Sequence, residues 1–236
     1  MSELLNHFGQ PVGVPVPGWV PRNRPARTTT VGHFCRIEPL DISRHATQLY
    51  DVIVADKEGQ TWTYLYYGPF EQEQDFLEWL TIAAASEDPQ FYAVVDNSGA
   101  AVGVVSYLRI DNAGGAIAVG HIIFAPCLRR TPAATECMYL MLRRAFDDLG
   151  YRRCEWRCDG LNERSRAAAQ RFGFRLEGVF RQATVNKGRN RDTACLSIID
   201  SEWPTIRNNF EHWLRPENFD EDGHQRSRLS MMAGTV

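Results

Sequence analysis

Two consecutive arginines stand at the start of a predicted helix in the segment 127–136, which reads CLRRTPAATE. The first turn of a helix carries amide N–H groups without intrahelical acceptors and forms the positive end of the helix dipole. With Arg129 and Arg130 beside it, such a turn is a binding site for a phosphate or pyrophosphate. These residues alone leave a second interpretation open, in which both arginines are solvated surface charges and Pro132 only starts the helix.

A second helix start carries polar side chains in the segment 162–174, NERSRAAAQRFGF. Asn162 and Ser165 stand in its first turn, directly after a predicted strand at 151–159. We expect this strand to lie beside the strand that precedes CLRRTPAATE, so that both helix starts face one crevice. The alternative is that Asn162 and Ser165 only cap the helix.

Apolar residues alternate with period two in three stretches that precede the arginine pair, at 90–96, 101–110 and 116–126. The turn sequences NSGA and DNAGG separate these stretches, so the sequence predicts three consecutive antiparallel strands. Apolar residues then recur at helical spacing within 134–149. This spacing predicts a helix with one apolar face directed at the sheet.

The remaining elements complete a mixed sheet covered by helices. They are a strand from residue 31, helices over about 42–55 and after 68–70, a final hairpin, and a closing helix over 201–214. The predicted order is β-α-α-β-β-β-α-β-α-β-β, an α/β (α+β) fold with a mostly antiparallel sheet and helices on both faces. The unit at 116–159 requires a right-handed parallel crossover, which puts the arginine junction at the carboxyl end of a strand, where ligands of α/β proteins commonly bind.

The chain divides into three parts by composition. Residues 1–30 hold five of the twelve prolines and form either an arm laid over the body or a loose tail. Residues 31–214 are long and apolar enough for one domain. Residues 215–236 are polar, and we expect a flexible tail there.

The overall charge and cysteine spacing exclude several classes of protein. With 26 basic and 29 acidic residues, a net charge of −3 gives no global attraction to nucleic acid or to an anionic membrane. The sequence shows no secretory signal and no run near the roughly 18–20 apolar residues of a membrane span, so we expect a cytoplasmic protein. The six cysteines lack CxxC pairs, which favours reduced core thiols over disulfides or a metal site.

Three segments together carry a resemblance to a known family. They are RRTPAATE at 129–136, the helix MYLMLRRAFDDLGYRRCEW after it, and the pattern N-x-x-S-x-x-A-x-x-R-F-GF-x-x-EG at 162–178. At these separations they resemble the GNAT acyl-CoA N-acyltransferase superfamily, and closely its RimJ/RimL-type branch, from about residue 31 to about residue 200. The resemblance implies a GNAT-like fold and a monomer or homodimer. It also implies transfer of an acetyl group from acetyl-CoA to a primary amine, either a protein N-terminal amine or a small molecule.

The resemblance also implies where acetyl-CoA binds. In the family's pyrophosphate loop, Gln/Arg-x-x-Gly-x-Gly/Ala, Arg129 would open the loop and Ala134 would close it, but Pro132 replaces the middle glycine and removes an amide donor. The pantetheine arm would lie between the strands 116–126 and 151–159, splayed near Phe124, where a backbone N–H polarises the thioester carbonyl. The residues assigned to the cofactor are Phe124, Arg129, Arg130, Thr131, Ala133, Ala134, Thr135, Asn162 and Ser165.

Catalysis requires a base that takes a proton from the attacking ammonium group. The candidates are His121 and Glu155. For His121 the pattern favours a partly buried structural histidine, and for Glu155 an ion pair with Arg153 or Arg157 is the alternative. The tyrosine that many family members use as an acid is replaced by Ala169. This leaves Ser165, or a water molecule, to protonate the departing thiolate.

The acceptor side offers aromatic residues in TWTYLYYGPF, at 61–70. The family resemblance assigns Trp62, Tyr64 and Tyr66 to a substrate wall, whereas packing of helices on the sheet is the alternative. The segment GRNRD at 188–192 either guides an acidic substrate or forms only a hairpin turn. Two other functions remain open, a catalytically silent acyl-CoA-binding module and a plain interaction protein.

Overall fold

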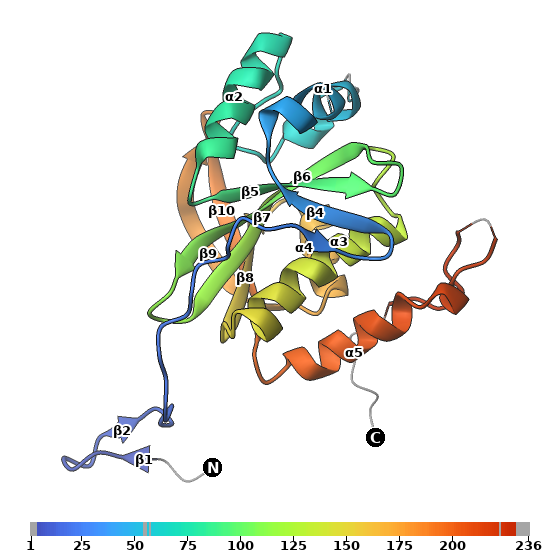
Figure 1. Ribbon diagram of the computed structural model, residues 1–236. Coiled ribbons are helices and arrows are strands. Elements are labelled where there is room, and N and C mark those ends of the chain that lie inside the picture. Colours follow the sequence, from blue (N-terminus) through green and yellow to red (C-terminus); the bar gives the residue numbers. More distant parts are fainter. Residues whose placement is uncertain (1–3, 54–55, 57, 222, 230–236) are drawn as a thin grey trace.

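Eight strands of the described residues form one sheet, in the order β3-β4-β5-β6-β7-β8-β10-β9. The structure is a computed structural model that describes residues 4–53, 56, 58–221 and 223–229. Neighbouring strands pair antiparallel except β7 and β8, which are parallel (Figure 1). The strands are β3 (Thr30–Val31), β4 (Cys35–Pro39), β5 (Gln90–Asp96), β6 (Ala101–Asp111), β7 (Ala116–Phe124), β8 (Arg153–Asp159), β9 (Arg175–Asn186) and β10 (Arg189–Ile199).

Two of the helices begin at a side chain that caps them. Thr131 caps the helix that starts at Pro132, Asn162 caps the next helix, and Gly173, with a φ of 96°, follows the end of that helix. The predicted helical residues 54 and 55 lie outside the described residues. The helices are α1 (Ile42–Ile53), α2 (Glu73–Ala85), α3 (Pro132–Arg143), which continues into a π-helical turn (Arg144–Asp148), α4 (Glu163–Arg171) and α5 (Trp203–Trp213), with 3₁₀ turns at Gln60–Trp62 and Pro216–Asn218.

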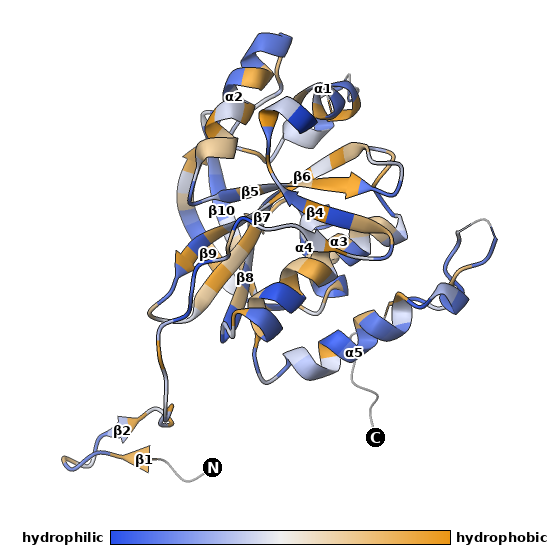
Figure 2. Ribbon diagram, in the orientation of Figure 1, coloured by the Kyte–Doolittle hydropathy of each residue, from blue (hydrophilic) through white to orange (hydrophobic). Residues whose placement is uncertain are grey.

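Two apolar cores fill the two faces of the sheet. Leu49 of α1 and Phe76 of α2 belong to the core on one face, and Met138 of α3 and Phe210 of α5 belong to the core on the other. Helices α1 and α2 lie on one side of the sheet, and α3, α4 and α5 lie on the other (Figure 1). Apolar residues are prominent along β6, shown in orange in Figure 2. The expected fold class, with a parallel β7-α3-β8 crossover inside an otherwise antiparallel sheet, is confirmed.

The first thirty residues consist of two different parts. A small hairpin of β1 (Leu4–Leu5) and β2 (Pro11–Val12) projects from the body (Figure 1). Its apolar side chains are exposed. Residues 19–28, here called the strap, are instead bound to the body. Trp19 donates to the carbonyl of Ala113, and Arg144 donates to the carbonyls of Ala26 and Thr28. The strap therefore lies on the body, which is the first of the two arrangements expected for residues 1–30, an arm laid over the body.

The polar C-terminal segment is also ordered over most of its length. The ring of Phe219 packs edge-on against Trp213, and Trp213 Nε1 donates to Gln225 Oε1 at 3.0 Å. Leu229 is buried against the core of α3 and α5. In the segment 215–236, for which a flexible tail was expected, Phe219, Gln225 and Leu229 thus contact the body, and residues 222 and 230–236 lie outside the described residues.

Candidate active site

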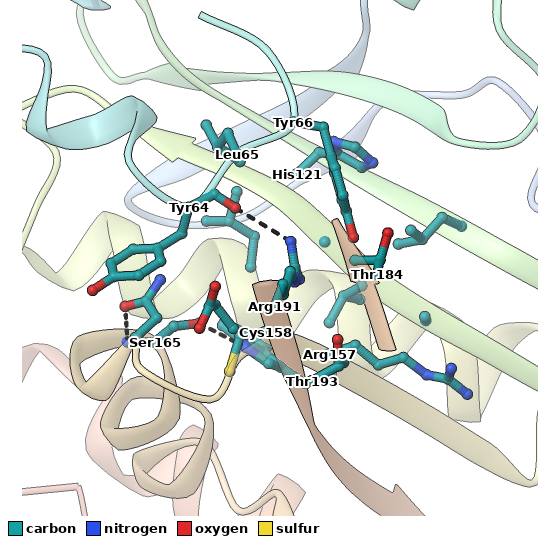
Figure 3. Close-up of a pocket in the computed structure, with 18 of the residues that line it drawn as sticks. Tyr64, Leu65, Tyr66, His121, Arg157, Cys158, Ser165, Thr184, Arg191 and Thr193 are labelled. Carbon is teal, nitrogen blue, oxygen red and sulfur yellow. Dashed lines mark hydrogen bonds between the residues drawn. The ribbon is translucent and has the colours of Figure 1, made fainter. Parts of the chain in front are cut away.

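The two parallel strands separate in the middle of the sheet. Pairing between β7 and β8 ends at Val119 opposite Trp156. A register shift on β7 and a φ of 47° at His121 mark a bulge at this point, which bends the strand away from its neighbour. A cavity of about 480 Å³ lies in the gap (Figure 3). The separation was predicted near Phe124, but it begins directly after Val119.

The start of α3 presents fewer free donors than predicted. The Thr131 hydroxyl accepts from the amide of Ala134 at 3.2 Å and donates to the Leu128 carbonyl at 2.7 Å. The hydroxyl of Thr131 and the amide of Ala134 are therefore both engaged in the helix cap. In the part of the chain that the structure describes, the amides of Arg130 and Ala133 have no acceptor. These two amides keep the anion-binding capacity of the junction.

The side chain of Thr135 does not face the junction. Thr135 is buried, and its hydroxyl accepts from Arg171 Nη1 of α4 at 3.0 Å. This bond ties α3 to α4, so the side chain has a structural role in place of the predicted cofactor contact.

The two arginines of the junction have different surroundings. Arg129 Nε donates to the carbonyl of Phe124 at 2.8 Å, and its Nη2 donates to Thr61 Oγ1 at 2.7 Å. Arg129 therefore links the end of β7 to the 3₁₀ turn that contains Thr61. The ring of Phe124 packs against the core. Both arginines are exposed, but among the described residues the Arg130 side chain makes no hydrogen bond or ion pair, so Arg130 is the arginine that is available to an anion.

The first turn of α4 forms the opposite wall of the gap. Asn162 Oδ1 accepts from the amide of Ser165 at 3.0 Å, which is the predicted cap. Ser165 Oγ accepts from Trp156 Nε1 at 3.0 Å, and the hydroxyl also hydrogen-bonds the Cys158 thiol in the same wall of the cavity. Both residues line the cavity, as expected from the two adjacent helix starts.

His121 lines the same cavity from the bulge of β7. Its Nδ1 lies 2.9 Å from the Tyr67 hydroxyl, and the two rings stack with centroids 5.7 Å apart. Burial, assisted by the charge of Arg191, lowers the pKa of His121 to about 4, so the imidazole is neutral at pH 7. Nε2 has a lone pair for a proton only in the tautomer whose Nδ1–H donates to Tyr67.

Comparison with known proteins now decides the family. A model described as an acetyltransferase (GNAT) domain matches residues 36–175. The chain belongs to the GNAT acetyltransferase family. No curated protein matched the chain in the corresponding search.

Solved structures agree with this family. A GCN5-related N-acetyltransferase from Brucella melitensis is 45% identical over 91% of this chain and 97% of its own, with a TM-score of 0.89. A probable GNAT-family acetyltransferase from Chromobacterium violaceum ATCC 12472 is 43% identical over 83% of this chain and 98% of its own, with a TM-score of 0.77. The microcin C7 self-immunity acetyltransferase MccE, solved with acetyl-CoA and AMP, shares the fold at 20% identity over 71% of this chain and 93% of its own, with a TM-score of 0.63.

Glu155 is not in the cavity of this acetyltransferase. Its carboxylate accepts from Arg153 Nε at 2.9 Å and pairs with Arg157 Nη2 at 2.9 Å. The prediction of Glu155 as the catalytic base is therefore wrong. The structure agrees with the alternative, an ion pair of Glu155 with Arg153 and Arg157.

The aromatic segment divides between the core and the cavity. Trp62 is only 2% exposed and packs edge-on against Tyr67 and Phe70, so its assignment to a substrate wall is wrong. Tyr64 and Tyr66 do line the cavity. The Tyr64 hydroxyl donates to the Leu161 carbonyl at 3.3 Å, beside the start of α4.

Sequence reasoning underestimated Arg191. The turn of the last hairpin lies between β9 and β10 at residues 187 and 188, so Arg191 belongs to strand β10 and not to the turn. Its side chain lines the acetyltransferase cavity beside Thr184 and Thr193 (Figure 3). The sequence signal is the segment GRNRD, for which guidance of an acidic substrate is one of the two interpretations given above, whereas the mixed polar and apolar residues of β10 do not single out Arg191.

The described residues contain no group of three or more His, Cys, Asp or Glu side chains placed to hold a metal ion. Within the same residues, no helix of the acetyltransferase combines the length and the apolarity needed to cross a bilayer. All six cysteines are free thiols, and five of them are buried as predicted, whereas Cys127 is exposed.

Proposed function

We propose that the protein is an acetyl-CoA-dependent N-acetyltransferase that acetylates a primary amine by direct attack within a ternary complex. The observation that carries this proposal is the gap between β7 and β8, which opens between the starts of α3 and α4 and contains the cavity. A gap between strands leaves backbone groups of β7 without sheet partners, and such groups bind an extended chain or a carbonyl oxygen.

The chain has groups suited to each part of acetyl-CoA. The free amides of Arg130 and Ala133, together with the exposed Arg130 side chain, fit the pyrophosphate. The gap after Val119 fits the pantetheine arm, and Asn162 lines its other wall. The loss of an amide donor at Pro132 does not prevent pyrophosphate binding or helix formation, because the amide N–H at this position of a helix has no acceptor within the helix.

In the proposed reaction the amine nitrogen attacks the thioester carbonyl carbon, so that a C–N bond forms and the C–S bond breaks. The neutral His121 imidazole takes the proton that the amine loses, directly or through a water molecule. Ser165 keeps its hydroxyl proton because Trp156 is the donor in their hydrogen bond, and this proton passes from the contact with the Cys158 thiol to the departing thiolate. Much of the acceleration comes from holding both reactants in one cavity.

The motif similarity to the RimJ/RimL-type branch supports an amine acceptor, either a protein N-terminus or a small molecule. Because this branch serves varied acceptors, the fold does not choose between them. The choice depends on the side chains that line the cavity.

A two-stage assay tests the proposed function. Calorimetry with acetyl-CoA is expected to show binding, and a panel of amines is expected to include acceptors that release free CoA. Absence of acetyl-CoA binding would overturn the proposal as a whole. Binding without CoA release on any amine or peptide would instead support the catalytically silent acyl-CoA-binding module.

A further inference from the structure

Arg191 is a buried cation without an anionic partner in the described residues. Only 6% of the residue is exposed, and no carboxylate among these residues lies within 4.0 Å of its guanidinium. Its Nε is buried with no hydrogen-bond partner, and Nη1 makes one long bond of 3.4 Å to the Tyr64 carbonyl. Burial of an unpaired charge is costly, so a protein normally supplies such a group with a partner.

The other arginines with an unsatisfied Nε differ from Arg191. Three further described arginines share this property, Arg22, Arg166 and Arg207, but each is only half-buried, so solvent reaches part of the residue. Arg144, which is nearly as buried as Arg191, donates instead to oxygen atoms of the strap. Arg191 alone of this group combines burial, an unpaired charge and a place in the cavity wall.

The charges that face this part of the cavity leave it positive. Arg157 of β8 also lines the cavity but is neutralised by Glu155, and Arg109 of β6 lies at the exposed rim. The acidic residue in the wall is Asp159 of β8, whose carboxylate accepts from the Leu161 amide at 2.9 Å and does not pair with Arg191. His121 is neutral, and the charge of Arg191 contributes to the lowering of its pKa.

The geometry around the guanidinium favours a planar anion. Its carbon lies 4.7 Å from the centroid of the Tyr66 ring, which covers one face of the plane. In Figure 3 the side chain points toward the segment that carries Tyr64 and Tyr66, on the side of the cavity where His121 lies. A guanidinium covered on its face binds through its edge, and a carboxylate matches this edge with two parallel hydrogen bonds.

We infer that the acceptor is a small primary amine that carries a carboxylate, as an amino acid does, and that Arg191 binds this carboxylate while the amine faces His121 and the thioester. This inference rests on the proposed function, since it assigns the acceptor of that same site. The hydroxyl groups of Thr184 and Thr193, which line the cavity beside Arg191, are positioned to share the binding of the anion.

The first experiment compares matched acceptors of the full-length protein. Each of the common L-amino acids is assayed for CoA release against its carboxamide and against the amine that lacks the carboxyl group. The acid is expected to exceed both in kcat/KM by roughly 10–100-fold, the range of a charge-assisted hydrogen bond. Equal rates for the acid and the amide would overturn the inference while the proposed function stands. A preference for O-phosphoethanolamine over every amino acid would overturn the inference that Arg191 binds a carboxylate and would show that it binds a phosphate.

The second experiment uses the variant Arg191→Gln with Arg189→Gln as the matched control, because Arg189 lies on the same strand but is exposed and lies outside the cavity wall. Arg191→Gln is expected to remove the preference for the acid over the amide and to bind acetyl-CoA as tightly as the wild type. Arg189→Gln is expected to retain the preference. A thermal shift with the N-acetyl amino acid product gives a readout without turnover, and the shift is expected in the wild type and lost in Arg191→Gln. An unchanged preference in Arg191→Gln would overturn the role of Arg191.

Discussion

Glu136 of α3 and Arg191 of β10 are both almost fully buried charged residues, 4% and 6% exposed, but their surroundings differ. The Glu136 carboxylate accepts from three successive amides, those of His33, Phe34 and Cys35, at 2.6–2.9 Å. Arg191 makes one long hydrogen bond to a carbonyl. The chain thus supplies hydrogen-bond partners for Glu136, which holds the scaffold together. Arg191, in the cavity wall, has a charge that a ligand can pair with.

Glu38 extends the comparison on the scaffold side. It is buried, and Arg36, Arg44 and His45 surround its carboxylate. Burial raises the pKa of Glu38, but the hydrogen bond from Arg36 and the charges of Arg44 and Arg36 outweigh this and hold the pKa below its usual value. A charge that the fold needs is kept ionised by neighbours from the same chain, which supports the interpretation of Arg191 as a functional group.

The largest effect is expected from removal of a satisfied charge. Glu136→Ala leaves three amides near the sheet edge without an acceptor, so we expect the free energy of unfolding to fall by about 3–5 kcal/mol. Urea denaturation measures this loss, with Glu71→Ala as a control because Glu71 is exposed. A loss no greater than that of the control would contradict the role assigned to Glu136.

The next effect concerns the base in the cavity. His121→Gln is expected to lower kcat by about 10²-fold, the lower range for general base catalysis, with little change in thermal stability. In the wild type, protonation of the acceptor amine and of His121 both lower kcat/KM as the pH drops, and the limb that belongs to His121 is expected at its pKa, about 4, because the protonated imidazole cannot accept a proton. Arg191→Gln removes a nearby positive charge, which raises the pKa of His121, so the acidic limb moves to higher pH. A limb that stays in place would show that His121 is not the titrating base.

A smaller effect separates the two arginines of the junction. Arg130→Ala is expected to weaken acetyl-CoA binding by about 1–2 kcal/mol, because the Arg130 side chain lies beside the free amides and, among the described residues, has no partner of its own. Arg129→Ala removes the bonds to Phe124 and Thr61 and is expected to act mainly on stability. Isothermal titration calorimetry measures acetyl-CoA binding by both variants, and thermal unfolding measures their stability. Weaker binding by Arg129→Ala and unchanged binding by Arg130→Ala would show that Arg129 contacts the phosphate.

The smallest effect is a change in stability without a ligand. Arg191→Met replaces an unpaired buried cation with an apolar side chain of similar length, so we expect the free energy of unfolding to stay equal or to rise by about 1 kcal/mol. Urea denaturation of the ligand-free protein measures this change. A loss of several kcal/mol would mean that Arg191 stabilises the fold itself, and the contrast with Glu136 would not hold.

The fold could be predicted from the sequence because its signals are local. Alternation of apolar residues marks the strands, and caps such as Thr131 and Asn162 mark the helix starts. The crossover between β7 and β8 then follows from chain order and handedness. For these reasons the mixed sheet and the two adjacent helix starts agree with the structure.

The candidate site could be predicted only in part, because it depends on contacts between distant segments. Glu155 lies on an inner strand, but arginines two residues away on either side neutralise it. Trp62 and Tyr66 come from one short aromatic run, yet only Tyr66 faces the cavity. Arg191 reaches the cavity because β10 pairs with β8, with Thr193 opposite Asp159, and no local pattern encodes that register.

The strap also shows that the folded domain includes residues outside the segment that the family model matches. The family model matches residues 36–175, whereas the strap supplies the carbonyls to which the buried Tyr92, Arg144 and Tyr151 donate. On the other side, β10 covers the edge of β8 and carries Arg191. A fragment cut to the matched residues would lose both the hydrogen bonds of the strap and the cavity wall that Arg191 forms, so the segment that identifies the family is shorter than the part of the chain that builds the cavity.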